Sequence, residues 1–433
     1  MEIDSKILSS NDKSMIEKDL TVYVKSDYAL PRKYKIYKHD VNGYGLPFVW
    51  AIDKLSYFPP PMFVTTKIKI KSPKITLRPL QVKCIAECSK EFDKPYGGGI
   101  INLQTGGGKT VCSLYLIGKY KMKTLIIVNT VELMNQWVDS IKKFLPDAKL
   151  GKIQGGTFDV KGKDIVIGMV QTISMRKEYT KEKFSEFSIV FTDEIHHFSA
   201  EVFSEALFKT RARYTFGLSA TVERKDKLEY IFKWHIGEVI FSDADGIKKQ
   251  KTEFIKLDYK GESSVEEVMR NGKPKISTMI TCISEDTERT KMICDYLKLL
   301  PDSRRILVLG DRVAHLNVMH NILGDKISGM FTGKTPETVK ESSKKKKIML
   351  ATYQIASEGF NHPALNTLLF ATPRSSVTQA IGRIYRKHHD ISPMIIDVVD
   401  WFSVFPYQYK KRKAIYNKQI DCKKPEENEC LFD

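Results

Sequence analysis

The stretch that decides the fold reads Leu103-Gln104-Thr105-Gly106-Gly107-Gly108-Lys109-Thr110. It follows the apolar run 100–103 and precedes a helix-like segment, 111–120. A strand, a glycine-rich turn and a helix start in this order cradle phosphate, because glycines let backbone N–H groups close on an anion and the helix N-terminus adds positive charge. In such a loop Lys109 contacts the β- and γ-phosphates and the Thr110 hydroxyl holds Mg²⁺. The complete pattern has a glycine where Leu103 stands, so the match is partial.

Two further strand ends carry polar residues of the kind that an NTPase needs. The apolar run 188–192 ends in Asp193 and Glu194, and we expect Asp193 to bind Mg²⁺ and Glu194 to polarise the attacking water. The alternative is an ordinary helix-capping pair. Ser219-Ala220-Thr221 follows the run 214–218, where its hydroxyl groups could relay nucleotide state to the rest of the chain.

A basic segment near the C-terminus completes the set. It reads Gln379-Ala380-Ile381-Gly382-Arg383-Ile384-Tyr385-Arg386. On a helix spanning 377–386, Arg383 and Arg386 would lie on one face because they are three residues apart. An arginine finger stabilises charge on the transferring phosphoryl group and is worth roughly 10³–10⁵ in rate. The alternative is an amphipathic helix with a solvated basic face, but four such signals in one chain and in this order indicate a nucleotide-driven motor.

Together, TGGGKT, DEIH, SAT and QAIGRIYR resemble superfamily 2 helicases of the DExH type. The elements at 217–226 and 379–387 are similar to the XPB and UvsW branches, and 356–386 resembles helicases of large cytoplasmic DNA viruses, kin of the poxvirus transcript-release helicase. Three positions depart from the family pattern. Asn361 replaces an aspartate, Lys225 a glutamate and Asn129 a proline, which puts the coupling of nucleotide to nucleic acid and XPB-style unwinding in question.

The resemblance implies a role for each matching residue. Catalysis would use Lys109, Asp193, Glu194, Gln379, Arg383 and Arg386, with Thr110 and Asp193 on Mg²⁺. ATP would be held by Arg78, Gln81, Thr105, Gly106, Gly107, Gly108, Lys109, Thr110, Glu358 and Gly359, with the Gln81 amide reading adenine. Thr130, Thr172 and Thr352 would contact the nucleic-acid backbone, unless they only cap helices, and His196, Ser219 and Thr221 would couple the two events.

Composition agrees with a motor that acts on a polyanion. The formal net charge is +18 in 433 residues, with 42% hydrophobic residues, so nucleic acid is the expected partner. No apolar run approaches the ~20 residues that span a bilayer, and residues 1–14 carry no signal-peptide core. We therefore expect an intracellular, soluble and monomeric protein, in the host cytoplasm or virion if it is viral. Seven cysteines without a disulfide pattern predict core packing at Cys84 and Cys88 and no structural metal.

The expected fold is α/β, with two RecA-like parallel-sheet domains in tandem. The predicted parts are an N-terminal strand-and-turn region at 1–73, a first motor domain at 74–245, a charged linker at 246–284, a second motor domain at 285–400 and a basic helix with an acidic tail at 401–433. The N-terminal region is either an accessory domain that touches substrate or a strap on the first motor domain. The leading function is an ATP-dependent DNA helicase or translocase. The alternatives are an RNA helicase, a nucleic-acid-binding protein with a vestigial ATPase, and a restriction-type motor subunit.

Overall fold

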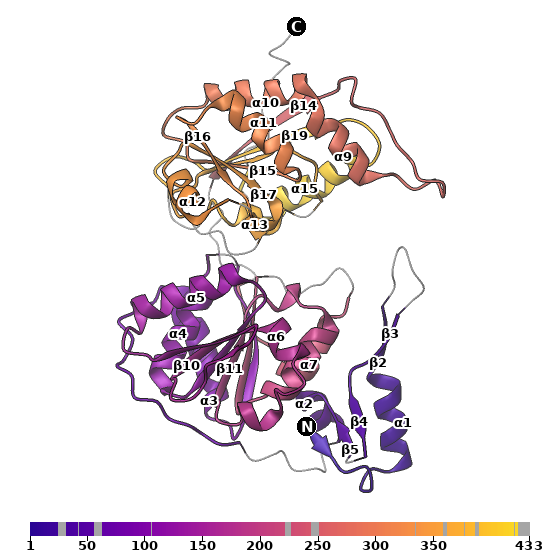
Figure 1. The fold of residues 1–433 in the computed structure, drawn as a ribbon, viewed down its shortest axis with the longest axis vertical. Helices are drawn as coiled ribbons and strands as arrows, with labels where there is room; N and C mark the ends of the chain where they lie inside the picture. The colour runs from indigo at the N-terminus through magenta and orange to yellow at the C-terminus, as the bar shows by residue number, and fades with distance from the viewer. Residues whose placement is uncertain are drawn as a thin grey trace. The chain divides into compact units, whose positions relative to one another are not determined.

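The computed structural model describes residues 1–24, 32–41, 43–55, 63–104, 106–220, 227–243, 251–333, 335–357, 362–375, 377–385, 389–419 and 421–422 (Figure 1). The chain divides into two compact units, Met1–Gly246 and Ile247–Asp433. Each unit is built around its own sheet and is described by itself below.

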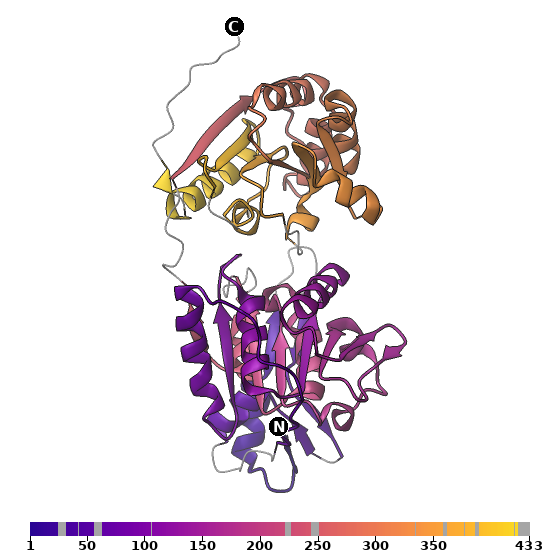
Figure 2. The ribbon, with the colours of Figure 1, turned by 90° about the vertical axis from the view of Figure 1, so that its left-hand side faces the viewer.

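The first unit contains an eight-stranded sheet among its described residues, in the order β13-β6-β12-β11-β7-β10-β8-β9. Its strands are β6 (Gly97–Asn102), β7 (Thr124–Val128), β8 (Leu150–Gln154), β9 (Thr157–Phe158), β10 (Ile165–Met169), β11 (Ile189–Thr192), β12 (Tyr214–Ser219) and β13 (Val239–Ser242). All neighbouring strands are parallel except the β8–β9 hairpin at one edge. Figure 2 shows these strands running side by side.

Helices cover both faces of this sheet because its strands are apolar on both sides. Neighbouring residues in one strand enter different cores: Ile101 faces one core and Ile100 the other. The first core is covered by α3 (Pro79–Phe92), α4 (Lys109–Tyr120) and α5 (Val131–Phe144). The second is covered by α6 (Val170–Met175), α7 (Ala200–Thr210) and α8 (Glu229–Ile236). In Figure 1, α6 and α7 lie on the side opposite α4 and α5. Because both faces of the sheet are buried, functional side chains that must reach solvent can lie only at the strand ends or on the edge strands.

The N-terminal region has more helix than the sequence indicated. It contains a three-stranded antiparallel sheet of β1 (Glu2–Ile3), β5 (Gly43–Gly45) and β4 (Lys38–Asp40), a hairpin of β2 (Thr21–Val24) and β3 (Arg32–Lys35), and the helices α1 (Ser10–Asp19) and α2 (Phe48–Lys54). A capping box between Ser9 and Asp12 starts α1, and this signal was readable in the sequence. The side chains of Ile16 and Trp50 share a hydrophobic core with Ile231 of α8.

The second unit contains a seven-stranded, all-parallel sheet among its described residues, in the order β16-β17-β15-β18-β19-β14-β20. Its strands are β14 (Lys251–Tyr259), β15 (Ile306–Gly310), β16 (Ser328–Phe331), β17 (Ile348–Thr352), β18 (Thr367–Phe370), β19 (Met394–Asp400) and β20 (Asp421–Cys422). Its helices are α9 (Ile276–Glu285), α10 (Thr287–Leu299), α11 (Val313–Leu323), α12 (Glu337–Ser343), α13 (Tyr353–Ser357), α14 (Thr378–Ile381) and α15 (Phe405–Gln419). Two separate sheets of parallel strands confirm the predicted α/β class.

The expected linker at 246–284 contains regular structure. Residues 251–259 form β14, which pairs along its length with β19, and residues 276–285 form α9. The charged residues led to the linker prediction, but they alternate with apolar ones: Ile255 and Leu257 pack against the core, while Lys256 and Asp258 are exposed. That alternation is typical of a strand near the edge of a sheet. The acidic end of the predicted tail, 423–433, lies outside the described residues.

Two buried ion pairs tie helices to β19. Arg289 of α10 donates to both carboxylate oxygens of Asp400, at 2.8 and 2.9 Å, and to the carbonyl of Ala371. Arg412 of α15 makes the equivalent pair with Asp397, at 2.8 and 2.9 Å. Both arginines are almost fully buried, so each carboxylate depends on its partner for neutralisation.

We expect Arg289→Ala to lower the free energy of unfolding by about 3–5 kcal/mol, because it leaves the buried Asp400 charge without a partner. Urea titration of the full chain measures this loss. Lys291→Ala, an exposed position on the same helix, serves as the control and should change stability little. Equal midpoints for the two variants would contradict the assigned role of the Arg289–Asp400 pair.

No helix within the described parts of the chain is long and apolar enough to cross a lipid bilayer.

Candidate functional site

The loop between β6 and α4 is shaped by glycine. Gly108 is the residue before α4 and has φ 99°, a left-handed conformation that side chains with a Cβ rarely adopt. A Cβ on Gly108 would also lie 2.1 Å from Nε2 of Gln81. No side chain caps the first turn of α4, and that turn contains no acid. Its backbone N–H groups are therefore left to meet an anion.

Arg78 and Gln81 brace this loop from α3. Nη2 of Arg78 donates to the carbonyls of Gly106 at 2.7 Å and Gly107 at 2.9 Å. The Gln81 amide donates to the Gly107 carbonyl at 3.2 Å and accepts from the Arg78 backbone N–H at 2.9 Å. Gln81 is buried, and both ends of its amide contact protein. Both residues thus lie against the glycine loop and bind its carbonyls.

The predicted lysine and acids meet at the carboxyl ends of β6 and β11. Nζ of Lys109 lies 2.9 Å from Oε1 of Glu194. Asp193, the residue next to Glu194, is 4% exposed, and its Oδ1 accepts the Glu194 backbone N–H at 2.9 Å. Glu194 has φ 49°, an uncommon conformation for a residue with a side chain and one that occurs often at functional sites. The turn this residue makes directs its carboxylate back toward the glycine loop.

The two adjacent carboxyl groups have opposite electrostatic environments. Burial, and then the negative charge of Glu194, raise the pKa of Asp193 to about 6. Burial would also raise the pKa of Glu194, but the Lys109 ammonium outweighs it and lowers that pKa to about 2. Asp193 therefore lacks a compensating cation of its own, whereas Glu194 has one. A divalent cation beside Asp193 would supply the missing positive charge.

Trp137 is a site residue that the sequence analysis did not identify. It is 1% exposed on α5, as expected for a core residue, and its Nε1 donates to Oδ2 of Asp193 at 2.8 Å. Buried tryptophan N–H groups need an acceptor, so a core tryptophan on a helix beside the acidic strand was the available signal. The bond fixes one carboxylate oxygen of Asp193 and leaves the other toward Glu194.

The expected coupling residues are joined in part. Nδ1 of His196 lies 2.8 Å from Oγ of Ser219 and 3.4 Å from Oε2 of Glu194. His196 thus connects the acid that follows β11 with the hydroxyl at the end of β12. Thr221, the third member of the predicted set, lies outside the described residues.

The three threonines expected to contact nucleic acid have different surroundings. Thr130 is the N-cap of α5, and its Oγ1 accepts the Leu133 N–H at 3.2 Å, which is the helix-capping alternative. Oγ1 of Thr172 accepts the Gly155 N–H at 3.1 Å. Thr352 is the last residue of β17 in the second unit and is half-buried. Their contact with nucleic acid stays a prediction.

The helix expected at 377–386 is shorter than predicted. α14 ends at Ile381, and Arg383 and Ile384 continue in turns with hydrogen bonds from i to i−3. Arg383 therefore lies outside α14, and the prediction that it shares a face with Arg386 stays a prediction, because Arg386 lies outside the described residues. Arg383 is 4% exposed within its unit. The side chain of Gln379, and the residues Thr105, Glu358, Gly359 and Arg386, lie outside the described parts.

The groups around the glycine loop fit a magnesium nucleotide. The uncapped first turn of α4 and Lys109 supply donors and positive charge for phosphate. Asp193 supplies a buried carboxylate whose raised pKa calls for a cation, and the hydroxyl of Thr110, on the first turn of α4, offers a neutral oxygen. Oxygen ligands of this kind are those that Mg²⁺ takes in NTPases.

The chain is similar to several known proteins. Residues 74–224 match the family model described as "Type III restriction enzyme, res subunit". A candidate ATP-dependent RNA helicase of Acanthamoeba polyphaga mimivirus is 30% identical over 440 residues, covering 96% of this chain and 84% of the viral protein. The DNA 3'-5' translocase XPB2 of Sulfurisphaera tokodaii is 33% identical over 170 residues, covering 39% of this chain and 36% of that protein. T4 UvsW is 19% identical, with 96% of each chain covered and a TM-score of 0.38.

The family match and the mimivirus relative define an ATP-dependent helicase of superfamily 2. The chain belongs to the family that includes the mimivirus helicase, because that likeness extends over nearly the whole length of both proteins. The resemblance found in the sequence is thereby confirmed.

Proposed function

We propose that this helicase hydrolyses ATP at the glycine loop and uses the cycle to move along DNA. The observation that supports the ATPase most strongly is the meeting of Lys109, Glu194 and the buried Asp193 at the carboxyl ends of β6 and β11. A vestigial site would have no need to keep a buried carboxylate beside an ion-paired lysine and glutamate.

The roles of the residues follow from their charges. Lys109 and the N–H groups of the first turn of α4 bind phosphate oxygens, while Thr110 and Asp193 hold Mg²⁺, which neutralises charge on the phosphates when bound. Glu194 pairs with Lys109 in the structure. When Lys109 turns to phosphate, the Glu194 carboxylate is released to orient the attacking water. Arg383 and Arg386 stabilise the charge that develops on the transferring phosphoryl group.

Two observations point to different nucleic acids. The match to a DNA translocase spans 170 residues at 33% identity, which favours DNA. The mimivirus relative, which matches over 84% of its own length, is named as an RNA helicase, and this makes RNA the second candidate. In either case contacts to the phosphate backbone predict that affinity falls steeply with salt.

ATPase stimulation by single-stranded DNA, duplex DNA, forked DNA and RNA, at one salt concentration, tests the proposal. We expect the forked or duplex DNA to stimulate most. Stimulation by RNA alone would contradict the DNA assignment and favour an RNA helicase. If turnover with every polymer equalled that of the Lys109→Ala variant, the proposal of a nucleic-acid motor would be wrong.

We expect Lys109→Ala to reduce stimulated ATP turnover by at least about 10²–10³-fold, because it removes a preorganised charge from the transferring phosphate. Steady-state phosphate release measures this loss. Lys119→Ala is the matched control on the same helix, since its Nζ contacts the Ser89 hydroxyl and the Tyr120 ring, away from the glycine loop, and should leave turnover unchanged. Near-normal turnover of the Lys109 variant would make the phosphate role wrong.

Trp137→Phe should raise the Mg²⁺ concentration that gives half-maximal turnover by roughly tenfold or more, because a hydrogen bond to a charged acceptor is worth about 1.5–3 kcal/mol. The Mg²⁺ titration of ATPase activity is the measurement. Trp234→Phe, in the core shared with the N-terminal region, is the control. A lower melting temperature with an unchanged Mg²⁺ titration would show that Trp137 only fills the core.

A further inference from the structure

A cavity of about 360 Å³ lies in the first unit, at the amino ends of the strands and thus opposite the glycine loop. On the side of the sheet, its lining comes from residues within 177–187, which precede β11, from residues within 207–211, which precede β12, and from His235, which precedes β13. The glycine loop follows β6 and Asp193 follows β11. Because the strands are parallel, their amino and carboxyl ends lie at opposite edges, so this cavity is separate from the nucleotide site. Its volume is within the range of small-molecule pockets.

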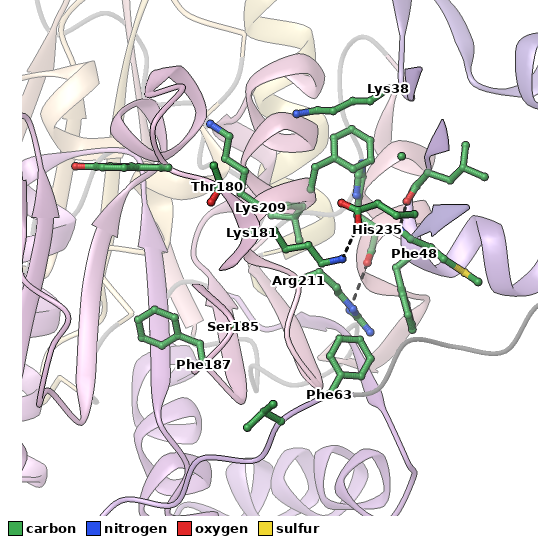
Figure 3. Close-up of a pocket in the computed structure, with 18 of the residues that line it drawn as sticks. Lys38, Phe48, Phe63, Thr180, Lys181, Ser185, Phe187, Lys209, Arg211 and His235 are labelled. Carbon is green, nitrogen blue, oxygen red and sulfur yellow. Dashed lines mark hydrogen bonds and ion pairs between the residues drawn. The ribbon is translucent and has the colours of Figure 1, made fainter. Parts of the chain in front are cut away.

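The cavity is formed where the N-terminal region meets the motor core. Lys38, Phe48 and Phe63 come from the N-terminal side, and Lys209 and Arg211 come from the end of α7 (Figure 3). Neither part of the chain would form this cavity without the other.

Arg211 is the residue that most needs a ligand. Its guanidinium carbon lies 4.2 Å from the centre of the Phe48 ring, and its Nη1 donates to the His235 carbonyl at 3.4 Å. Its Nε is buried and has no hydrogen-bond partner, and within the described chain no carboxylate forms an ion pair with it. Burial without an acid lowers the pKa of Arg211 to about 9. An arginine in this state is stabilised by any anion that reaches it.

The rest of the lining is also positive. Lys209 donates to the carbonyls of Ile173, Ser174 and Arg176 at 2.9–3.0 Å, which cap α6 but neutralise no charge. Lys38 pairs with Glu205 at 2.7 Å, and Lys181 pairs with Glu2 at 3.3 Å. Lys177 is exposed at the rim.

The lining therefore carries five basic side chains, those of Lys38, Lys177, Lys181, Lys209 and Arg211, against one acid, Glu2. This excess of positive charge selects an anion.

Apolar rings share the cavity with these cations. Phe48, Phe63, Phe187 and Phe208 all contribute to the lining. A planar guanidinium matches the oxygens of phosphate, and aromatic side chains offer faces and edges for a nucleobase. A carboxylate or sulfate alone would use the charge but not the rings.

We propose that this cavity binds a nucleoside phosphate, with the phosphate on Arg211 and the base against the phenylalanine rings. The site goes beyond the proposed ATPase, since it lies at the other edge of the sheet. The ligand has two sources with the same chemistry: a free nucleoside monophosphate, or the phosphorylated end of a nucleic-acid strand.

Calorimetric titration of the full chain with uridine 5'-monophosphate, uridine and inorganic phosphate tests the proposal, with the nucleotide site saturated by a non-hydrolysable ATP analogue. We expect the monophosphate to bind about tenfold or more tightly than uridine or phosphate alone, and Arg211→Met to weaken it by about tenfold or more. Arg213→Met is the matched control, because this arginine is two residues away and contacts Pro95 and Thr65 outside the cavity. Equal binding to wild type and Arg211→Met, or binding of phosphate as tight as that of the monophosphate, would overturn the proposal.

Thermal melting separates ligand binding from a purely structural role of Arg211. The monophosphate should raise the melting temperature of the wild type and of Arg213→Met but not that of Arg211→Met. If Arg211→Met does not fold, Lys177→Ala replaces it: this exposed rim residue should weaken binding by roughly threefold, as a surface charge does. Unchanged affinity in Lys177→Ala together with no ligand-induced shift in the wild type would reject the site. Oligouridylates with a 5'-phosphate or a 5'-hydroxyl then identify the source of the ligand. If the cavity binds strand ends, the 5'-phosphorylated oligomer should bind more tightly than the 5'-hydroxyl one, and Arg211→Met should remove the difference.

Discussion

Glu194→Gln should lower stimulated ATP turnover by about 10²–10⁴-fold while ATP still binds, because the amide keeps the shape of the side chain but cannot accept the proton of the attacking water. In the structure Glu194 neutralises Lys109 at 2.9 Å, and that attraction holds the pKa of the carboxyl at about 2. The neutral amide frees Lys109 for phosphate. We therefore expect the loss in kcat, with an unchanged or lower KM for ATP.

Single-turnover hydrolysis and equilibrium ATP binding, measured side by side, test this separation. Glu201→Gln is the control, because Glu201 is an exposed carboxylate on α7, outside the glycine loop and the acidic strand end. A variant with normal turnover would exclude Glu194 as the base. A variant that lost ATP binding instead would mean that its charge organises the loop rather than the water.

The sheets were predictable because burial on both faces leaves continuous apolar runs. The runs at 124–128 and 348–352 coincide with β7 and β17. The strands that were missed lie toward the sheet edges and carry polar residues, such as β8 with Lys152 and β14 with Lys256. Edge strands need only one buried face, so a reading based on apolar runs overlooks them.

Site residues could be predicted where the chemistry requires a particular residue type in a recognisable motif. They could not be predicted where the role depends on a tertiary contact. Lys109 was identified from the glycine-rich turn, and Asp193 and Glu194 from the apolar run that they follow; the three lie together at the carboxyl ends of β6 and β11. The sequence indicates only that a buried Trp137 needs an acceptor; it does not identify that acceptor as Asp193, 56 residues further along the chain. The cavity around Arg211 was equally invisible, because its lining comes from segments far apart in the chain.

Arg386→Ala should reduce turnover by roughly 10³–10⁵-fold and leave ATP affinity unchanged, because an arginine finger acts on charge that exists only in the transition state. Arg386 is the better of the two arginines to test. Arg383 is 4% exposed, so its truncation would disturb packing as well as chemistry and could lower the rate for either reason. Phosphate release and equilibrium ATP binding, measured on the same preparation, give the turnover rate and the ATP affinity.

Two companion variants decide how the Arg386 result is interpreted. Arg386→Lys keeps the charge but loses the planar fork, so partial recovery of kcat is expected from a finger, whereas a residue that only supports folding would recover its melting temperature instead. Arg305→Ala removes a guanidinium from the same unit, one that donates to the carbonyls of Asp302 and Arg304 at the amino end of β15, and should leave turnover near normal. A loss confined to KM in Arg386→Ala, with kcat equal to that of Arg305→Ala, would mean that Arg386 binds ground-state ATP and that the finger must be sought elsewhere.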